Sequence, residues 1–218
     1  MQAKSQIEQI VAMQILLNER TVPNWMAQDL DWDSAILVEA AEAIDSTDWK
    51  WWKHGETDMA NLRVEAVDLL HFLISKALKQ YRDTDFVVKT MLELVEHKGP
   101  NSLSYVDWLK QVALYTLENK VIKSLQALFG LFDRLEMNLT AVHQAYMAKN
   151  LLNHYRQERG YKDADGDYLK WIDGEEDNLV FARLVASLGE EVLDIELLRA
   201  TLFKAMDQVV AKARAAKA

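Results

Sequence analysis

The chain has 218 residues, a formal net charge of −9, a hydrophobic fraction of 50% and no cysteine. Its size and apolar content are sufficient for a buried core, while the absence of cysteine excludes disulfides, thiolate metal sites and a cysteine nucleophile. The negative charge argues against a nucleic-acid polymer as partner, because such binding depends on clustered Lys and Arg. A short phosphorylated ligand is compatible with this charge, since a few local cations or a carboxylate-bound metal can hold it.

The N-terminal stretch "MQAKSQIEQIVAMQILL" does not have the form of a signal peptide. It carries Glu8 inside its apolar part and has no small-residue cleavage site. No run in the chain approaches the roughly 18 apolar residues that a membrane span requires. We therefore expect a soluble, cytoplasmic protein that does not bind a membrane.

Only 2 prolines and 7 glycines interrupt long segments of strong helix formers, which predicts an all-α protein. In the second predicted helix, Asp33 or Ser34 is expected to cap the first turn. The third is apolar over much of its circumference, which predicts a central place in a helix bundle. The predicted helices cover 5–18, 33–46, 61–81, 85–96, 103–115, 120–135, 139–158, 178–188 and 192–216.

The chain shows no long linker and no clean internal repeat, so we expect a single domain over residues 1–218. Gly99 and Pro100 separate the early helices from the middle ones. The helices around 101–138 are candidates for a subdomain that moves or contacts a dimer partner. A polar loop rich in Gly and Asp is expected over 159–178.

Two carboxylate pairs occur on consecutive predicted helices, Glu39 with Glu42 and Glu65 with Asp68. A spacing of three residues places each pair on one helical face. If the two helices pack side by side, four negative charges converge and require a cation. Oxygen-only ligands suit Mg²⁺, or Mn²⁺, better than zinc or copper. The pattern therefore predicts a divalent-metal site between the second and third predicted helices.

Taken alone, one such pair is more often solvated surface charge. Here both pairs lie among apolar residues, and their occurrence on consecutive helices favours the metal site. His71 follows Asp68 by three residues, but ferritin-like iron sites need Glu-x-x-His on two helices, and neither Glu39 nor Glu42 is followed by a histidine at that spacing. We expect His71 to be a hydrogen-bonded residue of the core or to support a ligand.

Several stretches resemble the dimeric, all-α dUTPases, relatives of the MazG-type nucleoside triphosphate pyrophosphohydrolases. The most specific are the Trp-Lys cluster, "WKWWK" at residues 49–53, and the segment that begins "KNLLNHYRQERGYK" at residue 149. The matching motifs are scattered over about positions 13–178. They read "MQILLNERTVPNW", "EAAEAIDSTDWKWWK", "NLRVEAVDLLHFLIS" and "AKNLLNHYRQERGYKDADGDYLKWIDGEEDN".

The resemblance implies an all-α, MazG-like multi-helix bundle with a four-helix metal-binding core. It further implies a homodimeric enzyme that hydrolyses dUTP to dUMP and pyrophosphate, and also accepts dUDP. It implies that water attacks the β-phosphorus on a magnesium cluster held by Glu39, Glu42, Glu65 and Asp68. Either Glu39 or Glu42 could take the proton of the water, and we prefer Glu39. MazG-like sequences commonly double the first glutamate, whereas this chain has Val38 there, which leaves the number of metal ions open.

Gln14 and Asn18 are four residues apart and so face the same way on the first predicted helix. A side-chain amide carries both a donor and an acceptor and can pair with a uracil edge. Without the resemblance, two polar residues near a helix end are an equally good interpretation. With it, we expect Gln14 and Asn18 to recognise uracil, and Trp25 to form a wall of the pocket.

The last of these stretches, residues 148–178, is called the later motif below. It supplies cations and hydrogen-bond donors for the phosphates. On an isolated helix, Lys149 and Arg156 would more often be solvated, but their spacing of seven, with Asn153 between them, keeps them on one face. The resemblance assigns Asn178 to the sugar. The residues expected at the phosphates are Lys149, Asn153, Arg156, Tyr161 and Lys162.

The Trp-Lys cluster directly follows the first carboxylate pair. We expect Trp49 and Trp52 to lie near the base as a rim or lid, with Lys50 or Lys53 directed at phosphates. An equally good interpretation is that the tryptophans anchor the helix end or the dimer. Two other functions fit the chain: a related pyrophosphohydrolase acting on dCTP or another nucleotide, and a noncatalytic helical module that binds partners through its middle helices.

Overall fold

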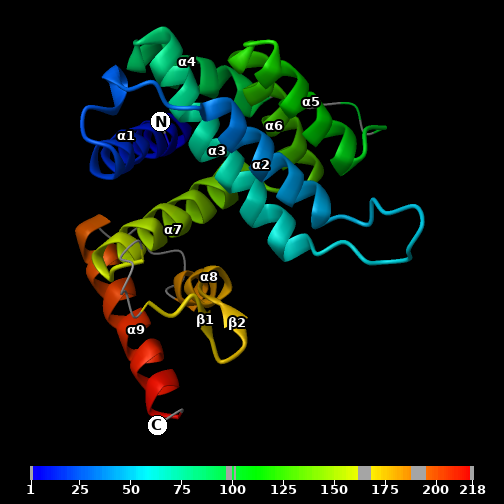
Figure 1. The fold of residues 1–218 in the computed structure, drawn as a ribbon. Helices are drawn as coiled ribbons and strands as arrows, with labels where there is room; N and C mark the ends of the chain where they lie inside the picture. The colour runs from blue at the N-terminus through cyan, green and yellow to red at the C-terminus, as the bar shows by residue number, and fades with distance from the viewer. Residues whose placement is uncertain (1, 97–99, 101, 162–167, 188–194, 217–218) are drawn as a thin grey trace. The chain divides into compact units, whose positions relative to one another are not determined.

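The computed structural model describes residues 2–96, 100, 102–161, 168–187 and 195–216 (Figure 1). The chain forms two compact units, residues 1–146 and 147–218, and the boundary falls within helix α7, Leu139–Glu158. The units are described separately below. The expected single domain stays a prediction.

The first unit is helical, as predicted. Helix α2 begins at Trp32, where the Asp31 carboxylate accepts a hydrogen bond from the Ser34 amide at 3.0 Å. The predicted cap at Asp33 or Ser34 is therefore wrong, because Asp31 satisfies the exposed amides of the first turn. The elements of this unit before α7 are α1 Gln2–Thr21, the 3₁₀ turn η1 Trp25–Ala27, α2 Trp32–Asp45, α3 Met59–Tyr81, α4 Thr84–Val95, α5 Tyr105–Leu117 and α6 Val121–Arg134.

Helix α3 lies at the centre of the first unit and packs against α1, α2, α4 and α6 (Figure 1). Its side chains are buried on most of its circumference, among them Leu62, Leu69, Leu73 and Ile74. This confirms the central position that its all-round apolar pattern predicts. The side chains that α3 turns toward α1 and α2 are consequently held in a packed interior.

The middle helices α5 and α6 pack closely on each other, and they also contact α2 and α3 respectively. Gly130 of α6 permits this approach, because a Cβ atom at that position would lie 2.7 Å from Cη2 of Trp108 on α5. The two helices thus support the pair α2 and α3 from one side. Their expected part in a dimer contact or in motion stays a prediction.

The second unit contains the C-terminal part of α7, a two-stranded hairpin and two more helices, α8 Asp177–Ser187 and α9 Ile195–Ala215. Strands β1, Trp171–Ile172, and β2, Glu175–Glu176, pair antiparallel inside the stretch predicted as loop. Asp173 and Gly174 both have positive φ, 51° and 87°, which is the backbone of the tight Asp-Gly hairpin turn. Among the residues that the structure describes, no helix is both long and apolar enough to cross a membrane.

Candidate active site

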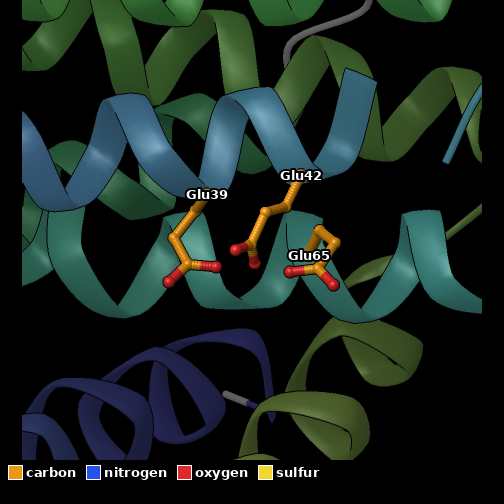
Figure 2. A group of neighbouring side chains, drawn as sticks. All are labelled: Glu39, Glu42 and Glu65. Atoms are coloured by element: carbon orange, nitrogen blue, oxygen red, sulfur yellow. The ribbon is translucent and has the colours of Figure 1, made fainter. Parts of the chain in front are cut away.

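Three of the four predicted carboxylates meet between α2 and α3. One oxygen from each of Glu39, Glu42 and Glu65 lies within 4.8 Å of the other two. Figure 2 shows the carboxyl groups of Glu39 and Glu42 extending from α2 toward α3, beside that of Glu65. Glu65 is buried, with 8% of its surface exposed, whereas Glu42 is exposed and Glu39 intermediate. The group therefore has a buried side and an accessible side.

The connection between α2 and α3 sets the register that brings these glutamates together. Asp58 caps α3 by accepting from the Asn61 amide at 3.0 Å. Its own amide donates to the carbonyl of Ser46 at 2.8 Å, and Asn61 Nδ2 donates to Ser46 Oγ at 2.8 Å. The end of α2 is thus tied to the start of α3. Because both pairs lie within two turns of this tie, Glu42 comes to lie opposite Glu65.

The three glutamates have the chemistry of a hard-cation site. Two carboxylates at this separation repel each other by roughly 3 kcal/mol if the effective dielectric constant is about 20, so a bound cation would relieve a large local repulsion. All the donors are carboxylate oxygens, which Mg²⁺ and Mn²⁺ prefer and which soft metals do not. The residues present therefore fit the divalent metal that the carboxylate pattern predicts.

Asp68 lies on α3 one turn after Glu65 and is partly buried, and it is not one of the three carboxylates that meet. His71, one turn further, is buried, with Nδ1 2.9 Å from the carbonyl oxygen of Val67. Because a carbonyl only accepts, Nδ1 carries the hydrogen. The ring stacks on Tyr146, with centroids 4.0 Å apart. His71 is thus held in the core beside the carboxylate helix.

Gln14 and Asn18 lie side by side on α1 and are hydrogen-bonded to each other, with Gln14 Nε2 2.8 Å from Asn18 Oδ1. Both are buried, at 2% and 7% exposure. Ser75 of α3 contacts both amides, at 3.0 Å from Gln14 Nε2 and 2.9 Å from Asn18 Nδ2. The structure therefore brings the two predicted base-recognition residues into one polar group. Trp25 is also buried and packs edge to face on Trp32.

The Trp-Lys cluster lies in the connection between α2 and α3, and its tryptophans are exposed; Trp51 has 90% of its surface accessible. Trp49 and Trp52 pack edge to face at 5.3 Å. Lys50 forms an ion pair with Asp45 at 2.6 Å, and this hydrogen bond is the main reason why the pKa of Asp45 lies below its usual range. Lys53 is exposed. Lys50 is thus paired with protein, while the aromatic rings face solvent.

The phosphate residues predicted in the later motif belong to the second unit, where Arg156 is hydrogen-bonded to protein groups. Its guanidinium donates to both oxygens of Asp177, at 2.8 and 2.6 Å, and to Asn178 Oδ1 at 3.1 Å. Lys149 also donates to Asn178 Oδ1, at 3.2 Å. Burial by itself would lower the pKa of Arg156, but the hydrogen bonds and charge of Asp177 outweigh it and raise that pKa above its ordinary value.

The structure also describes two further phosphate candidates, Tyr161 and Asn153. Tyr161 is exposed, and the Arg156 guanidinium lies 5.2 Å from the centroid of its ring. Asn153, on α7 between Lys149 and Arg156, is partly buried. Lys162 lies outside the described residues. The second unit thus brings Lys149, Arg156 and Asn178 into one hydrogen-bonded group.

A comparison with known protein families shows which family contains this chain. A family model described as dUTPase matches residues 6–161, which contain the three glutamates, the two amides and four of the five phosphate residues predicted in the later motif. The chain belongs to this all-α dimeric dUTPase family. As a member, it is an enzyme that hydrolyses dUTP, which sets aside the noncatalytic module. A search of curated proteins gave no match.

In this dUTPase, the sequence patterns did not indicate the residues that hold the site residues in place. Asp177 is completely buried and binds Arg156, and the Tyr168 hydroxyl donates to it at 2.6 Å. Ser75 and Tyr146 hold the amides of Gln14 and Asn18. Because Asp177 directly precedes the predicted Asn178, its charge beside a candidate site residue is a signal from which its role could have been predicted. Ser75 and Tyr146 carry no comparable signal, because such residues are common in helices.

Proposed function

We propose that this dUTPase hydrolyses dUTP to dUMP and pyrophosphate in a Mg²⁺-dependent reaction, and that it also accepts dUDP. The observation that carries the proposal is the meeting of Glu39, Glu42 and Glu65 within 4.8 Å between two packed helices. Three acidic oxygens at this distance suit a divalent cation, and a site with few protein ligands leaves positions for phosphate oxygens. Asp68, one turn beyond Glu65, is proposed as the fourth ligand. Mn²⁺ is the expected substitute.

A divalent ion bound there would orient the phosphates, offset developing negative charge and make water easier to deprotonate. The chain's own glutamates provide the base: Glu39, or Glu42 in its place, takes a proton from the attacking water. The water oxygen bonds to the β-phosphorus, the bond to the bridging oxygen of the α-phosphate breaks, and dUMP leaves. Glu39 is the preferred base because it is less exposed than Glu42 and so more readily shielded from bulk water.

The remaining candidates divide among the parts of the nucleotide. Gln14 and Asn18 are proposed to recognise the uracil edge, with Trp25, Trp49 and Trp52 as aromatic neighbours of the base. Asn178 is proposed to contact the sugar. The phosphate contacts are proposed to come from Lys50, Lys53, Lys149, Asn153, Arg156, Tyr161 and Lys162. For Lys50 and Arg156 this requires exchange of a present partner, Asp45 or Asp177, for phosphate.

A substrate panel tests the proposal. Pyrophosphate release from dUTP, dCTP, dTTP and UTP is measured with Mg²⁺, with Mn²⁺ and after chelation. We expect dUTP to be preferred and chelation to abolish turnover. Glu65→Gln removes one ligand and is expected to lower kcat by at least about a hundredfold, whereas Glu93→Gln, a matched change at an exposed glutamate of α4, leaves it unchanged. Turnover of dUTP that persists in chelator would refute the metal dependence.

We also propose that the enzyme is a homodimer, to which the middle helices contribute. Leu114 and Leu117 of α5 are exposed, at 52% and 64%, and apolar side chains on one helix favour contact with a partner. Sedimentation equilibrium at low micromolar concentration measures the mass directly. A wild-type dimer that becomes a monomer in Leu117→Glu supports an interface that includes α5. A monomeric wild type would contradict the proposed homodimer.

A further inference from the structure

A buried group of polar side chains joins α1, α3 and α7 within the first unit. Gln14 Nε2 donates to both Asn18 Oδ1 and Ser75 Oγ, and Asn18 Nδ2 donates to the same Ser75 Oγ. The Tyr146 hydroxyl donates to Gln14 Oε1. Ser75 and Tyr146 are fully buried. In such surroundings each hydrogen bond is strong and a lost one is costly, so the group favours a single arrangement.

One main-chain carbonyl sets the direction of these hydrogen bonds. Ser75 Oγ lies 2.8 Å from the carbonyl oxygen of His71, one turn earlier, and 3.3 Å from Asn18 Oδ1. Because a carbonyl oxygen only accepts, the Ser75 hydroxyl donates its hydrogen to His71, the closer of the two contacts. Ser75 then offers lone pairs to the two amides, and both must turn their nitrogens toward it. Gln14 consequently turns its oxygen toward Tyr146, which donates.

Reversing either amide breaks this pattern. If Asn18 alone turned over, its nitrogen would face Gln14 Nε2, donor against donor. If both amides turned over, Ser75 would have to give up its bond to His71, and Tyr146 would have to accept instead of donate. Serine and tyrosine hydroxyls together therefore hold the amides of Gln14 and Asn18 in one orientation.

The orientation of an amide decides which pyrimidine it pairs with. Uracil presents N3–H as a donor beside O4 as an acceptor, whereas cytosine presents N3 as an acceptor beside an amino donor. An amide pairs with uracil in one orientation and with cytosine after a turn of 180°. In the observed network Asn18 gives one of its two amide hydrogens to Ser75, so the fixed group still has a hydrogen and a carbonyl lone pair to offer to a base.

We propose that Ser75 and Tyr146 are positioning residues that determine the preference of this enzyme for uracil over cytosine. They act through Gln14 and Asn18 by preventing the amide reversal that would accommodate a cytosine edge. The inference rests on the proposed contact of these amides with the base. It assigns base choice to two hydroxyl groups that lie outside the predicted set of site residues.

The test compares variants that remove only a hydroxyl group. Ser75→Ala deletes the shared acceptor, and Tyr146→Phe deletes the donor to Gln14. Ser124→Ala is the matched control, because Ser124 of α6 is equally buried and also hydrogen-bonds a main-chain carbonyl, in its case that of Val112 on α5. For each folded variant, kcat/KM is measured with dUTP and dCTP, and dUMP and dCMP affinities are measured by calorimetry. The ratio between the bases is the readout, since a general loss of stability lowers both values together.

We expect Ser75→Ala to lower the dUTP-to-dCTP ratio by about tenfold or more, Tyr146→Phe to lower it in the same direction, and Ser124→Ala to leave it unchanged. If Ser75→Ala does not fold, Tyr146→Phe decides the matter. An unchanged ratio in the folded variants, or an equal fall in Ser124→Ala, overturns the inference while the proposed function stands. A wild type that does not prefer dUTP overturns the base assignment itself, and the inference with it.

Discussion

Gly130 of α6 lies directly against the indole of Trp108 on α5, so that a Cβ atom at position 130 would be 2.7 to 2.9 Å from three ring atoms. Gly130→Ala should therefore destabilise the first unit by about 1–3 kcal/mol through overpacking, even though Ala is the better helix former by about 1 kcal/mol. Urea unfolding measures the change. Trp108→Phe in the same chain provides space and should reduce the penalty; a Gly130→Ala variant as stable as the wild type would contradict the close contact.

The ion pair between the buried Lys76 and the half-exposed Asp33 should respond differently to loss of each partner. Lys76 of α3 is buried, pairs with Asp33 of α2 and donates to the Thr116 carbonyl of α5 at 3.0 Å. Asp33→Ala leaves a buried ammonium ion and should cost about 3 kcal/mol. Lys76→Met leaves a half-exposed carboxylate that water can solvate, and should cost about 1 kcal/mol. Unfolding curves that reverse this order would refute the asymmetry.

Arg156 should be sensitive even to replacement by lysine, because its fork binds both oxygens of the fully buried Asp177. One ammonium group cannot reproduce that geometry. Arg156→Lys should lower the unfolding free energy by about 2 kcal/mol. The control is Arg183→Lys, at an exposed pair with Glu175, where the change should be below about 0.5 kcal/mol. Thermal melts that are equal for both variants would contradict the difference.

Acid should loosen the attachment of α9 to α7. Asp207 of α9 binds the Arg159 guanidinium at 3.0 and 2.7 Å and accepts from the Tyr155 hydroxyl at 2.7 Å. The bond to Arg159 is the main cause that lowers the pKa of Asp207. The folded state therefore binds this proton less readily, so the stabilisation is present above the usual carboxyl pKa of 3.8 and is lost as pH falls below it.

Asp207→Asn should remove part of this acid response. Stability measured from pH 6 to pH 3 by hydrogen exchange in α9 should fall less steeply in the variant, which starts from a lower value at pH 6. Parallel curves for the two proteins would mean that Asp207 does not control the attachment of the helix.

Much of the fold follows from local patterns. The all-round apolar segment 61–81 predicted a central helix, and α3 occupies that place. Helix ends were less predictable. Asp33 or Ser34 was expected to cap the second helix, but Asp31 has an equally suitable side chain, and only the folded backbone shows which one accepts the hydrogen bond. The hairpin at Trp171–Glu176 was expected as loop because its strands are two residues long, too short to show alternation.

The candidate site shows the same division. Local spacing alone predicts that Glu39 and Glu42 share one helical face, as do Glu65 and Asp68, because residue spacing sets positions around a single helix. It could not determine that three of these carboxylates meet, that Asp177 neutralises Arg156, or that Ser75 holds both amides. Those contacts join segments far apart in the chain. They form only in the folded chain, because they depend on how the helices are rotated and shifted against one another when their apolar faces are buried.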